Sequence, residues 1–345
     1  RHCYQADVPM PRLNKKVDPS VIEYLKHVSS VHERKVNFVF WGGEPLLYLP
    51  MIKQVINELG DDAFDFWMMS NGALLTDEIV DYLNAHGIGF SVSNDGPDTA
   101  KIRGINILEN EEFLSCFKRI KKTCVGCCTH AYNIDPKKTV AYIKSKVGNK
   151  TSIYYQYHLE CTHPMDNDLY AYNLEAYRKN IRELCEEYFD DIREGRQDTP
   201  SIYAVEKGIK AAENFHRRRA WGMPDVWLPE CMPLRNEINI DIHGTVHACH
   251  NRLSPIGTIQ DSFETLKTAS DTYFGKAVSQ KKECEDCSIN HICRHGCPLN
   301  PMSDGQRECC KAEKIYWEEC EKAWLSHVGL MVPKKIPIVL GESKR

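Results

Sequence analysis

The sequence predicts an α/β protein in two parts, and two observations lead to this interpretation. The first is a regular alternation of strand-like and helix-like segments through residues 18–160. Strands that alternate with helices of 10–15 residues form a parallel sheet with right-handed crossovers. The second is a dense run of cysteines between residues 231 and 310, which indicates a metal-binding region in a chain of this size.

The elements of the first part follow from hydrophobic spacing. Apolar residues three and four apart after Asp18-Pro19 predict a helix over 18–31. A continuous apolar run predicts a buried strand over 36–41, leading into Gly42-Gly43-Glu44-Pro45. The same reasoning predicts strands over 64–69, 87–94, 123–133 and 152–160, and helices over 51–59, 76–86, 111–122 and 136–147.

Polar, glycine-containing turns follow these strands. Ser70-Asn71-Gly72 ends one strand, and Ser93-Asn94 followed by Asp95-Gly96-Pro97 ends the next. Ligands of α/β sheets and barrels bind at the carboxyl ends of the strands, so these turns predict a nucleotide-type binding platform. The simpler alternative is that they are only tight turns, with Arg103 a solvated charge nearby.

Two charged helices, predicted over 174–194 and 202–219, carry the chain toward the cysteines. The segment 221–230 contains two prolines and a glycine and is the expected boundary between the parts. Beyond it, strands over 238–242 and 245–248 flank His243-Gly244 and predict a hairpin.

Composition excludes several classes of protein. The 345 residues are 42% hydrophobic, which is enough for a sizeable core. A net charge of −4 without a long basic run argues against a nucleic-acid partner. No apolar stretch reaches the length of a membrane span. Sixteen cysteines without a secretory signal favour a reducing cytoplasm.

The cysteine spacing narrows the kind of site. Cys231 is followed by twelve residues, Gly244, four residues and Cys249. A second run has spacers of two, five and three residues, with a further pair at 309 and 310: Cys284, Cys287, Cys293, Cys297, Cys309 and Cys310. Structural zinc and a disulfide scaffold are both possible for such a pattern. Iron–sulfur chemistry is favoured, because the thiols exceed one four-cysteine site and form two groups.

These motifs, in this order, resemble the radical S-adenosylmethionine enzymes of the peptide-maturase type. Cys3, the Gly42-Gly43-Glu44-Pro45 turn and the two later strand-end turns carry the first half of the resemblance. The later cysteines are similar to the seven-cysteine pattern of the SPASM auxiliary-cluster domain, and the resemblance covers residues 1–325. It implies a partial (β/α)6 TIM-type barrel over 1–220. A small Cys-rich SPASM domain with a β-hairpin and short helices would follow over 221–325, with a tail over 326–345.

One departure concerns the radical cluster. The family carries CxxxCxxC after its first strand, and Cys3 matches the third cysteine, whereas the first strand and the first two cysteines are not in this sequence. The expectation is that the sequence begins inside the protein. The alternative is a natural chain that lacks this cluster.

The resemblance implies two sets of binding residues, and it assigns no catalytic residue. Gly42 and Gly43 would admit the methionine end of S-adenosylmethionine, and Glu44 would accept from its ammonium. Ser93 or Asn94 would bind its ribose or carboxylate, Arg103 would bind the carboxylate, and His2 would lie against the adenine. The full cofactor set is His2, Gly42, Gly43, Glu44, Pro45, Ser70, Asn71, Ser93, Asn94 and Arg103.

The implied metal ligands divide into three [4Fe–4S] clusters. Cys3 belongs to the radical cluster. A nearer auxiliary cluster would use Cys231, Cys249 and Cys297, with its fourth ligand open. An outer one would use Cys284, Cys287, Cys293 and Cys310, which is preferred to Cys309 because Lys314 lies four residues on.

Three functions follow as hypotheses. The favoured one is a peptide-modifying oxidoreductase in which a 5′-deoxyadenosyl radical abstracts hydrogen and an oxidative thioether, C–C or C–O crosslink forms in a ribosomally made peptide. The second is an anaerobic sulfatase-maturing enzyme. His250 counts against it, because that family carries an aspartate after the equivalent of Cys249. The third is a non-catalytic iron–sulfur or zinc module that binds a peptide. The expected partners are a peptide or protein substrate and a reductant such as flavodoxin or ferredoxin, without nucleic acid or membrane.

Overall fold

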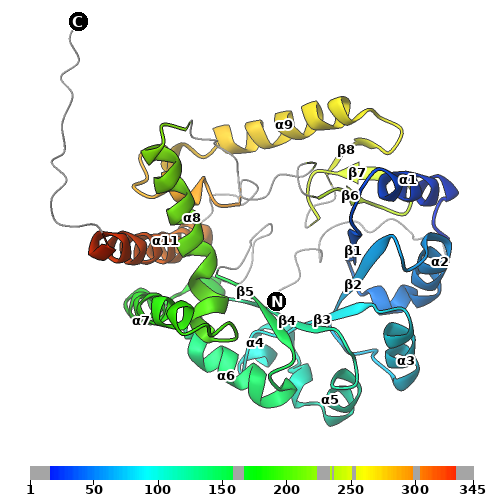
Figure 1. The fold of residues 1–345 in the computed structure, drawn as a ribbon, viewed down its shortest axis with the longest axis horizontal. Coiled ribbons are helices and arrows are strands. Elements are labelled where there is room, and N and C mark those ends of the chain that lie inside the picture. Colours follow the sequence, from blue (N-terminus) through cyan, green and yellow to red (C-terminus); the bar gives the residue numbers. More distant parts are fainter. Residues whose placement is uncertain are drawn as a thin grey trace, which may run out of the picture.

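The computed structural model describes residues 16–157, 167–223, 234, 237–250, 254–297 and 304–331. Five parallel strands form one sheet in the order β1-β2-β3-β4-β5. Their bounds are β1 Val36–Phe40, β2 Phe64–Ser70, β3 Gly89–Ser93, β4 Thr123–Cys128 and β5 Ser152–Gln156. Figure 1 shows the strands curving into an open arc, as in part of a barrel.

Helices cover the outer side of this arc (Figure 1). They are α2 Leu49–Leu59, α3 Asp77–Ala85, α5 Glu111–Phe117 and α6 Pro136–Val147, with a short α4 at Thr99–Arg103 after β3. Side chains of Thr76, Asn110 and Asp135 cap the first turns of α3, α5 and α6 by accepting backbone N–H bonds. Each cap satisfies a donor that the helix itself leaves unpaired.

The core lies between the sheet and these helices. Phe66, Met68, Phe90 and Val92 of the central strands are 0–2% exposed. Burying each such side chain contributes about 1.5–3 kcal/mol. Because β2 alternates between buried and half-buried positions, Ser70 at its carboxyl end lies on the same buried face as Phe66 and Met68.

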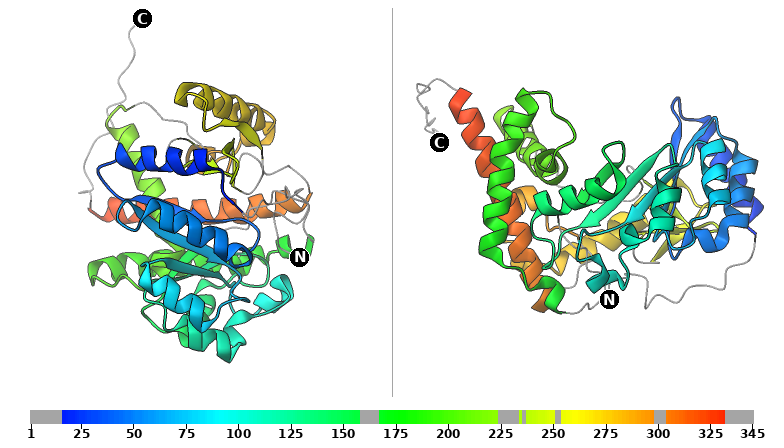
Figure 2. Two further views of the ribbon diagram at one scale, coloured as in Figure 1. Left: turned by 90° about the vertical axis from the view of Figure 1, so that its right-hand side faces the viewer. Right: turned by 90° about the horizontal axis from the view of Figure 1, so that it is seen from below.

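Three long helices pack together at the β5 end of the sheet: α7 Leu174–Arg193, α8 Pro200–Ala220 and α11 Asp304–Met331. The Gly208 N–H donates to the Tyr316 hydroxyl at 3.0 Å. A Cβ at Gly208 would lie 2.5 Å from the Cys320 sulfur, so glycine is needed for this close approach. The right-hand view of Figure 2, from below, shows these helices at the opposite end of the molecule from α1 (Pro19–Ser30).

A small antiparallel sheet follows α8 in sequence: β6 Asn239–Ile240, β7 Thr245–His247 and β8 Pro255–Thr258. Asp241 shapes its hairpin by accepting from the N–H groups of His243 and Thr245. The Asp18 N–H donates to the Ile242 carbonyl at 3.0 Å, which connects the hairpin to the start of α1. Helices α9 (Phe263–Ser279) and α10 (Asn290–Cys293) come next.

The predicted α/β class and the order of elements are confirmed, and none of the described helices is long and apolar enough to span a membrane. The strand predicted over 123–133 is too long, since β4 ends at Cys128. There Asn133 turns the chain: its amide donates to the Cys128 carbonyl and accepts from the His130 N–H. Residues 158–160 of the last predicted strand lie outside the described residues.

The second part differs more from expectation. Strand β8 and helix α9 were not predicted. A helix was expected only after Cys310, whereas α11 begins at Asp304, and both α9 and α11 are longer than the short helices expected there. Helix α11 runs to Met331, past residue 326 where the tail was expected to begin. It packs on α7 and α8, and its Ile315, Tyr316, Trp317 and Cys320 belong to the same core cluster as the barrel residues.

Candidate active site

Glu44 joins the ends of two neighbouring strands. Its Oε1 accepts from the Leu46 N–H at 3.1 Å and from the Ser70 hydroxyl at 2.7 Å. Its Oε2 accepts from the Asn71 N–H at 2.9 Å. A carboxylate offers about four acceptor positions, so this one can take a further donor such as an ammonium. The predicted residues Glu44, Ser70 and Asn71 therefore lie together at the carboxyl ends of the neighbouring strands β1 and β2.

The turn before Glu44 requires its two glycines. Gly42 and Gly43 have φ values of 97° and 55°, in the left-handed region that side chains rarely adopt. Pro45, which the resemblance also implied, begins a 3₁₀ helix over Pro45–Tyr48, and Glu44 caps it through the bond to Leu46. The turn therefore presents backbone without side chains beside a fixed carboxylate, and this arrangement fits the amino-acid end of S-adenosylmethionine.

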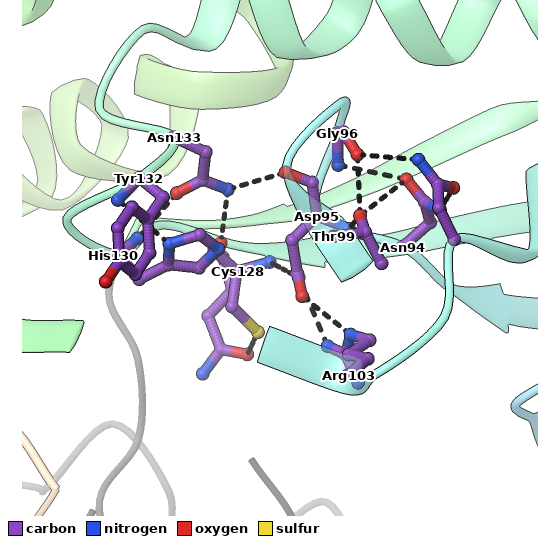
Figure 3. Close-up of polar contacts among 11 residues, drawn as sticks. Asn94, Asp95, Gly96, Thr99, Arg103, Cys128, His130, Tyr132 and Asn133 are labelled. Atoms are coloured by element: carbon purple, nitrogen blue, oxygen red, sulfur yellow. Dashed lines mark hydrogen bonds and ion pairs between the residues drawn. The ribbon is translucent and has the colours of Figure 1, made fainter. Parts of the chain in front are cut away.

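Asn94 organises the next strand end. Its Oδ1 accepts from the Gly96 N–H at 2.9 Å and the Thr99 hydroxyl at 3.1 Å, and its amide donates to Asn106 Oδ1 at 2.8 Å (Figure 3). The side chain is 0% exposed. These contacts make Asn94 a turn-forming residue, and its binding of ribose or carboxylate stays a prediction. Ser93, at the end of β3, is half-buried.

Arg103 lies against a buried carboxylate that was not among the predicted site residues. Its Nε and Nη2 donate to the two oxygens of Asp95, at 2.6 and 3.1 Å. Asp95 is 0% exposed and also accepts from the Cys128 N–H at 3.0 Å, so it joins β3 to β4 (Figure 3). The role of Arg103 toward the cofactor carboxylate also stays a prediction.

His130 is the second feature that sequence analysis missed. It is 0% exposed, and its Nδ1 accepts from the Tyr132 N–H at 3.1 Å, which places the proton of a neutral ring on Nε2. Burial lowers the pKa of His130 to about 4, so the ring is neutral at pH 7. The available signal was a polar residue just beyond a strand end, but the overlong strand prediction had placed His130 inside the strand.

The thiols predicted for the outer cluster lie in one neighbourhood. Burial raises the pKa of the Cys293 thiol well above its ordinary value, and the Glu313 carboxylate and the Cys310 and Cys284 thiols add to this. Desolvation, Glu313 and the Cys284 and Cys287 thiols likewise raise the pKa of Cys310, to about 12. Thiols this crowded resist ionisation, and a coordinated metal reverses this because it deprotonates its ligand thiols outright.

Two of the three cysteines predicted for the nearer cluster, Cys249 and Cys297, are among the described residues. Cys249 is buried with Ala248 and Phe274, and Cys297 packs against this same small group. No three His, Cys, Asp or Glu side chains in the described parts of the chain are grouped so that they could hold a single metal ion. His2, Cys3, Cys231 and the side chain of Cys309 lie outside the described residues.

One contact connects the two predicted sites. The ring of Trp41, directly before Gly42, meets the ring of His250, directly after Cys249, edge-on with centroids 4.8 Å apart. The imidazole Nδ1 of His250 is 3.6 Å from the Glu237 carboxylate. The predicted cofactor turn therefore lies next to the hairpin that carries Cys249.

Comparisons with known proteins agree with this architecture. Residues 1–145 match the family model described as the radical SAM superfamily. Polyhistidine-tagged anSMEcpe with bound AdoMet is similar in structure, with a TM-score of 0.63, 17% identity and 90% of each chain covered. Native anSMEcpe with bound AdoMet and Kp18Cys peptide has a TM-score of 0.62 at 17% identity, with 91% of each chain covered.

SuiB of Streptococcus suis is a more distant structural neighbour. Its TM-score is 0.50 at 13% identity, with 83% of this chain and 70% of that chain covered. No curated protein sequence matches. At these identities the solved structures show a shared fold only. The family model matches the first part of the chain to the radical SAM superfamily. Residues 1–145 are a radical SAM domain, from a superfamily whose members use S-adenosylmethionine and a [4Fe–4S] cluster.

Proposed function

We propose that this protein is a peptide-modifying radical SAM oxidoreductase that installs an oxidative thioether, C–C or C–O crosslink in a ribosomally made peptide. The observation that carries the proposal is the contact of Trp41 with His250 at 4.8 Å. It puts the turn that would hold S-adenosylmethionine beside Cys249, a proposed auxiliary-cluster ligand. A site for hydrogen abstraction next to an electron acceptor suits an oxidative reaction.

The strand-end residues would bind and orient the cofactor. Glu44 would accept from its ammonium, since one carboxylate oxygen carries only the Asn71 N–H among the contacts described above. Gly42 and Gly43 would let its methionine end approach the backbone. When bound, S-adenosylmethionine and a [4Fe–4S] cluster with one open iron supply a 5′-deoxyadenosyl radical, and the hard chemistry is theirs. The protein sets position and excludes water.

The electron count supports an auxiliary centre. A crosslinked peptide has lost two hydrogens relative to its precursor. One leaves as a hydrogen atom to the 5′-deoxyadenosyl radical, which becomes 5′-deoxyadenosine. The other must leave as a proton and an electron, and the proton needs a base while the electron needs an acceptor. We propose that Cys249 and Cys297 would hold one iron–sulfur cluster and that Cys284, Cys287, Cys293 and Cys310 would hold another. Such clusters would supply the electron acceptor.

The thiol arrangement favours clusters over a single zinc ion. One tetrahedral zinc brings its ligand sulfurs to within about 3.8 Å of one another, given a Zn–S bond of about 2.3 Å. A four-iron cluster separates its ligand sulfurs more widely than one ion does. The cysteines of this region outnumber the four ligands that one tetrahedral zinc ion takes.

A second candidate is sulfatase maturation, the oxidation of a peptide Cys or Ser to formylglycine. It is kept because of the structural likeness to anSMEcpe, which was solved with the Kp18Cys and Cp18Cys peptides. His250 and its contact with Glu237 distinguish the present chain from the aspartate expected at this position in that candidate. For either reaction we propose that flavodoxin or ferredoxin supplies the initiating electron.

The test is mass spectrometry of a candidate peptide incubated with S-adenosylmethionine, dithionite and the protein with its CxxxCxxC motif complete. A crosslink lowers the peptide mass by two hydrogens. If the peptide carries deuterium at the position from which hydrogen is abstracted, that deuterium appears in 5′-deoxyadenosine. The Cys3→Ala variant is the matched control, because it should abolish both. Formylglycine in the peptide would favour the second candidate. A colourless protein with stoichiometric zinc would overturn both and favour a binding module.

A further inference from the structure

The segment between Cys293 and Cys297 has an unusual backbone. Arg294, His295 and Gly296 have φ values of 53°, 71° and 57°, so three consecutive residues are left-handed. Two of them carry side chains, which disfavour this conformation. Gly296 is also confined, because a Cβ there would lie 2.8 Å from the Glu313 carboxylate. A turn of this kind persists only where its surroundings hold it.

Lys281 supplies such a contact from beside the turn. It is only 5% exposed, and its ammonium donates to the His295 carbonyl at 3.0 Å and to the Cys297 carbonyl. The backbone carbonyl of Lys281 accepts from the Cys284 N–H at 3.0 Å. Lys281 therefore contacts the segment that carries Cys284 through its backbone carbonyl, and the turn that carries Cys297 through its side-chain ammonium.

The charge of Lys281 lies beside the proposed ligand cysteines. Its ammonium is bonded to the carbonyl of Cys297, and its backbone carbonyl is bonded to the N–H of Cys284. Glu313 brings a buried charge of opposite sign to the same place: it is 5% exposed, and its carboxylate lies 3.9 Å from the Cys293 sulfur. A buried ammonium is costly unless it is paired or hydrogen-bonded, and two carbonyl acceptors satisfy it here.

We propose that Lys281 is a positioning residue for the auxiliary cysteines. Its two hydrogen bonds hold the left-handed turn so that Cys293 and Cys297 keep their relative orientation. Its positive charge, at the Cys297 carbonyl, would stabilise the electron that a cluster held by these cysteines gains on reduction. Charge and hydrogen bonding to ligand groups are recognised determinants of cluster reduction potential. This inference rests on the proposed function, since it requires clusters at these thiols.

Two substitutions separate the bonds from the charge. Lys281→Gln keeps an N–H donor for the carbonyls and removes the charge, whereas Lys281→Met removes both. The control is Lys282→Met, which removes an exposed lysine from the next position. All variants are made in the Cys3→Ala background, so that only auxiliary clusters contribute. Iron content is measured by metal analysis, and reduction potentials by titration followed with electron paramagnetic resonance.

We expect Lys281→Gln to retain iron and to shift an auxiliary potential to a more negative value. A tenfold change in the one-electron equilibrium corresponds to about 59 mV. Lys281→Met should also lose iron, and Lys282→Met should match the parent. If both Lys281 variants keep the parent's iron content and potentials, the inference is wrong while the proposed function stands. If the parent protein itself holds no iron, the proposed function fails first.

Discussion

Arg103 holds the fully buried carboxylate of Asp95 at both oxygens, with distances of 2.6 and 3.1 Å. This paired geometry is the one that guanidinium groups form most strongly with carboxylates. Removing the partner of a buried charge leaves that charge uncompensated. Arg103→Leu should therefore lower the free energy of unfolding by about 3–5 kcal/mol in anaerobic urea titrations.

Arg119 offers a matched control for this prediction. It bridges Asp77 and Asp81 on the surface with its side chain 46% exposed, so Arg119→Leu should cost less than about 1 kcal/mol. An Arg103→Leu variant of unchanged stability that no longer binds S-adenosylmethionine would contradict the structural role and favour the direct role expected from sequence.

Glu44→Gln should weaken S-adenosylmethionine binding. The substitution removes an ionic acceptor for the cofactor ammonium, and such charge-assisted bonds contribute about 1.5–3 kcal/mol. That corresponds to a loss of about 10- to 150-fold in affinity, measurable by isothermal titration. Ser70→Ala removes the 2.7 Å bond that orients Glu44 and the 3.0 Å bond from the Gly72 N–H, but it leaves the Glu44 charge in place and should have a smaller effect. Equal affinity in Glu44→Gln and the parent would place the cofactor elsewhere.

Anaerobically purified protein should be brown and contain about eight irons in its carboxyl-terminal part, four per cluster. The double substitution Cys284→Ala and Cys287→Ala should remove roughly half of them, because those thiols belong to one proposed cluster. Cys116→Ala is the control, since this cysteine lies on α5 among the helices outside the sheet. Iron and sulfide assays check the counts, and an unchanged iron content in the double variant would argue against the assignment.

Glu319 links α11 to α7 and predicts a pH dependence. Burial opposes its ionisation, but hydrogen bonds from Arg182, Arg178 and Lys322 outweigh burial and lower the pKa of Glu319. A lowered folded-state pKa stabilises the protein above the unfolded value of about 4.3, and this stabilisation is lost as pH falls through the folded value. Glu319→Gln should lower the free energy of unfolding by about 1.5–3 kcal/mol at pH 7.

The cost of Glu319→Gln should shrink as the pH is lowered below about 4, where the parent carboxylate also becomes neutral. Urea unfolding at pH 7 and at successively lower pH measures it. Glu187→Gln, which removes a surface partner of Lys137 at 50% side-chain exposure, should change stability by less than about 1 kcal/mol at either pH. A cost for Glu319→Gln that does not vary with pH would indicate packing rather than charge.

The alternating part of the chain was predictable because each strand and helix there has its own hydrophobic period. For the candidate site, the motifs selected Glu44, Ser70 and Asn71, and hydrogen bonds bring these three together, while their binding of a cofactor stays a prediction. Asp95 was missed because its role depends on burial and on the Cys128 N–H of the neighbouring strand, which spacing does not encode. His130 was missed because the strand predicted over 123–133 included it, whereas β4 ends at Cys128. The cysteine pattern implied a helix after Cys310 but not the length of α11, which depends on packing of Ile315 and Tyr316 in the main core.

The position of helix α11 has a consequence for how the protein is degraded after exposure to oxygen. Its Cys310 belongs to the thiol group, while its Trp317 and Cys320, two to three turns further on, are buried against the barrel helices. Oxidative loss of the cluster proposed at Cys310 would therefore loosen one end of the same helix that covers part of the main core. We expect damaged molecules to expose this helix to proteases early, so that inactive enzyme is cleared while intact enzyme survives.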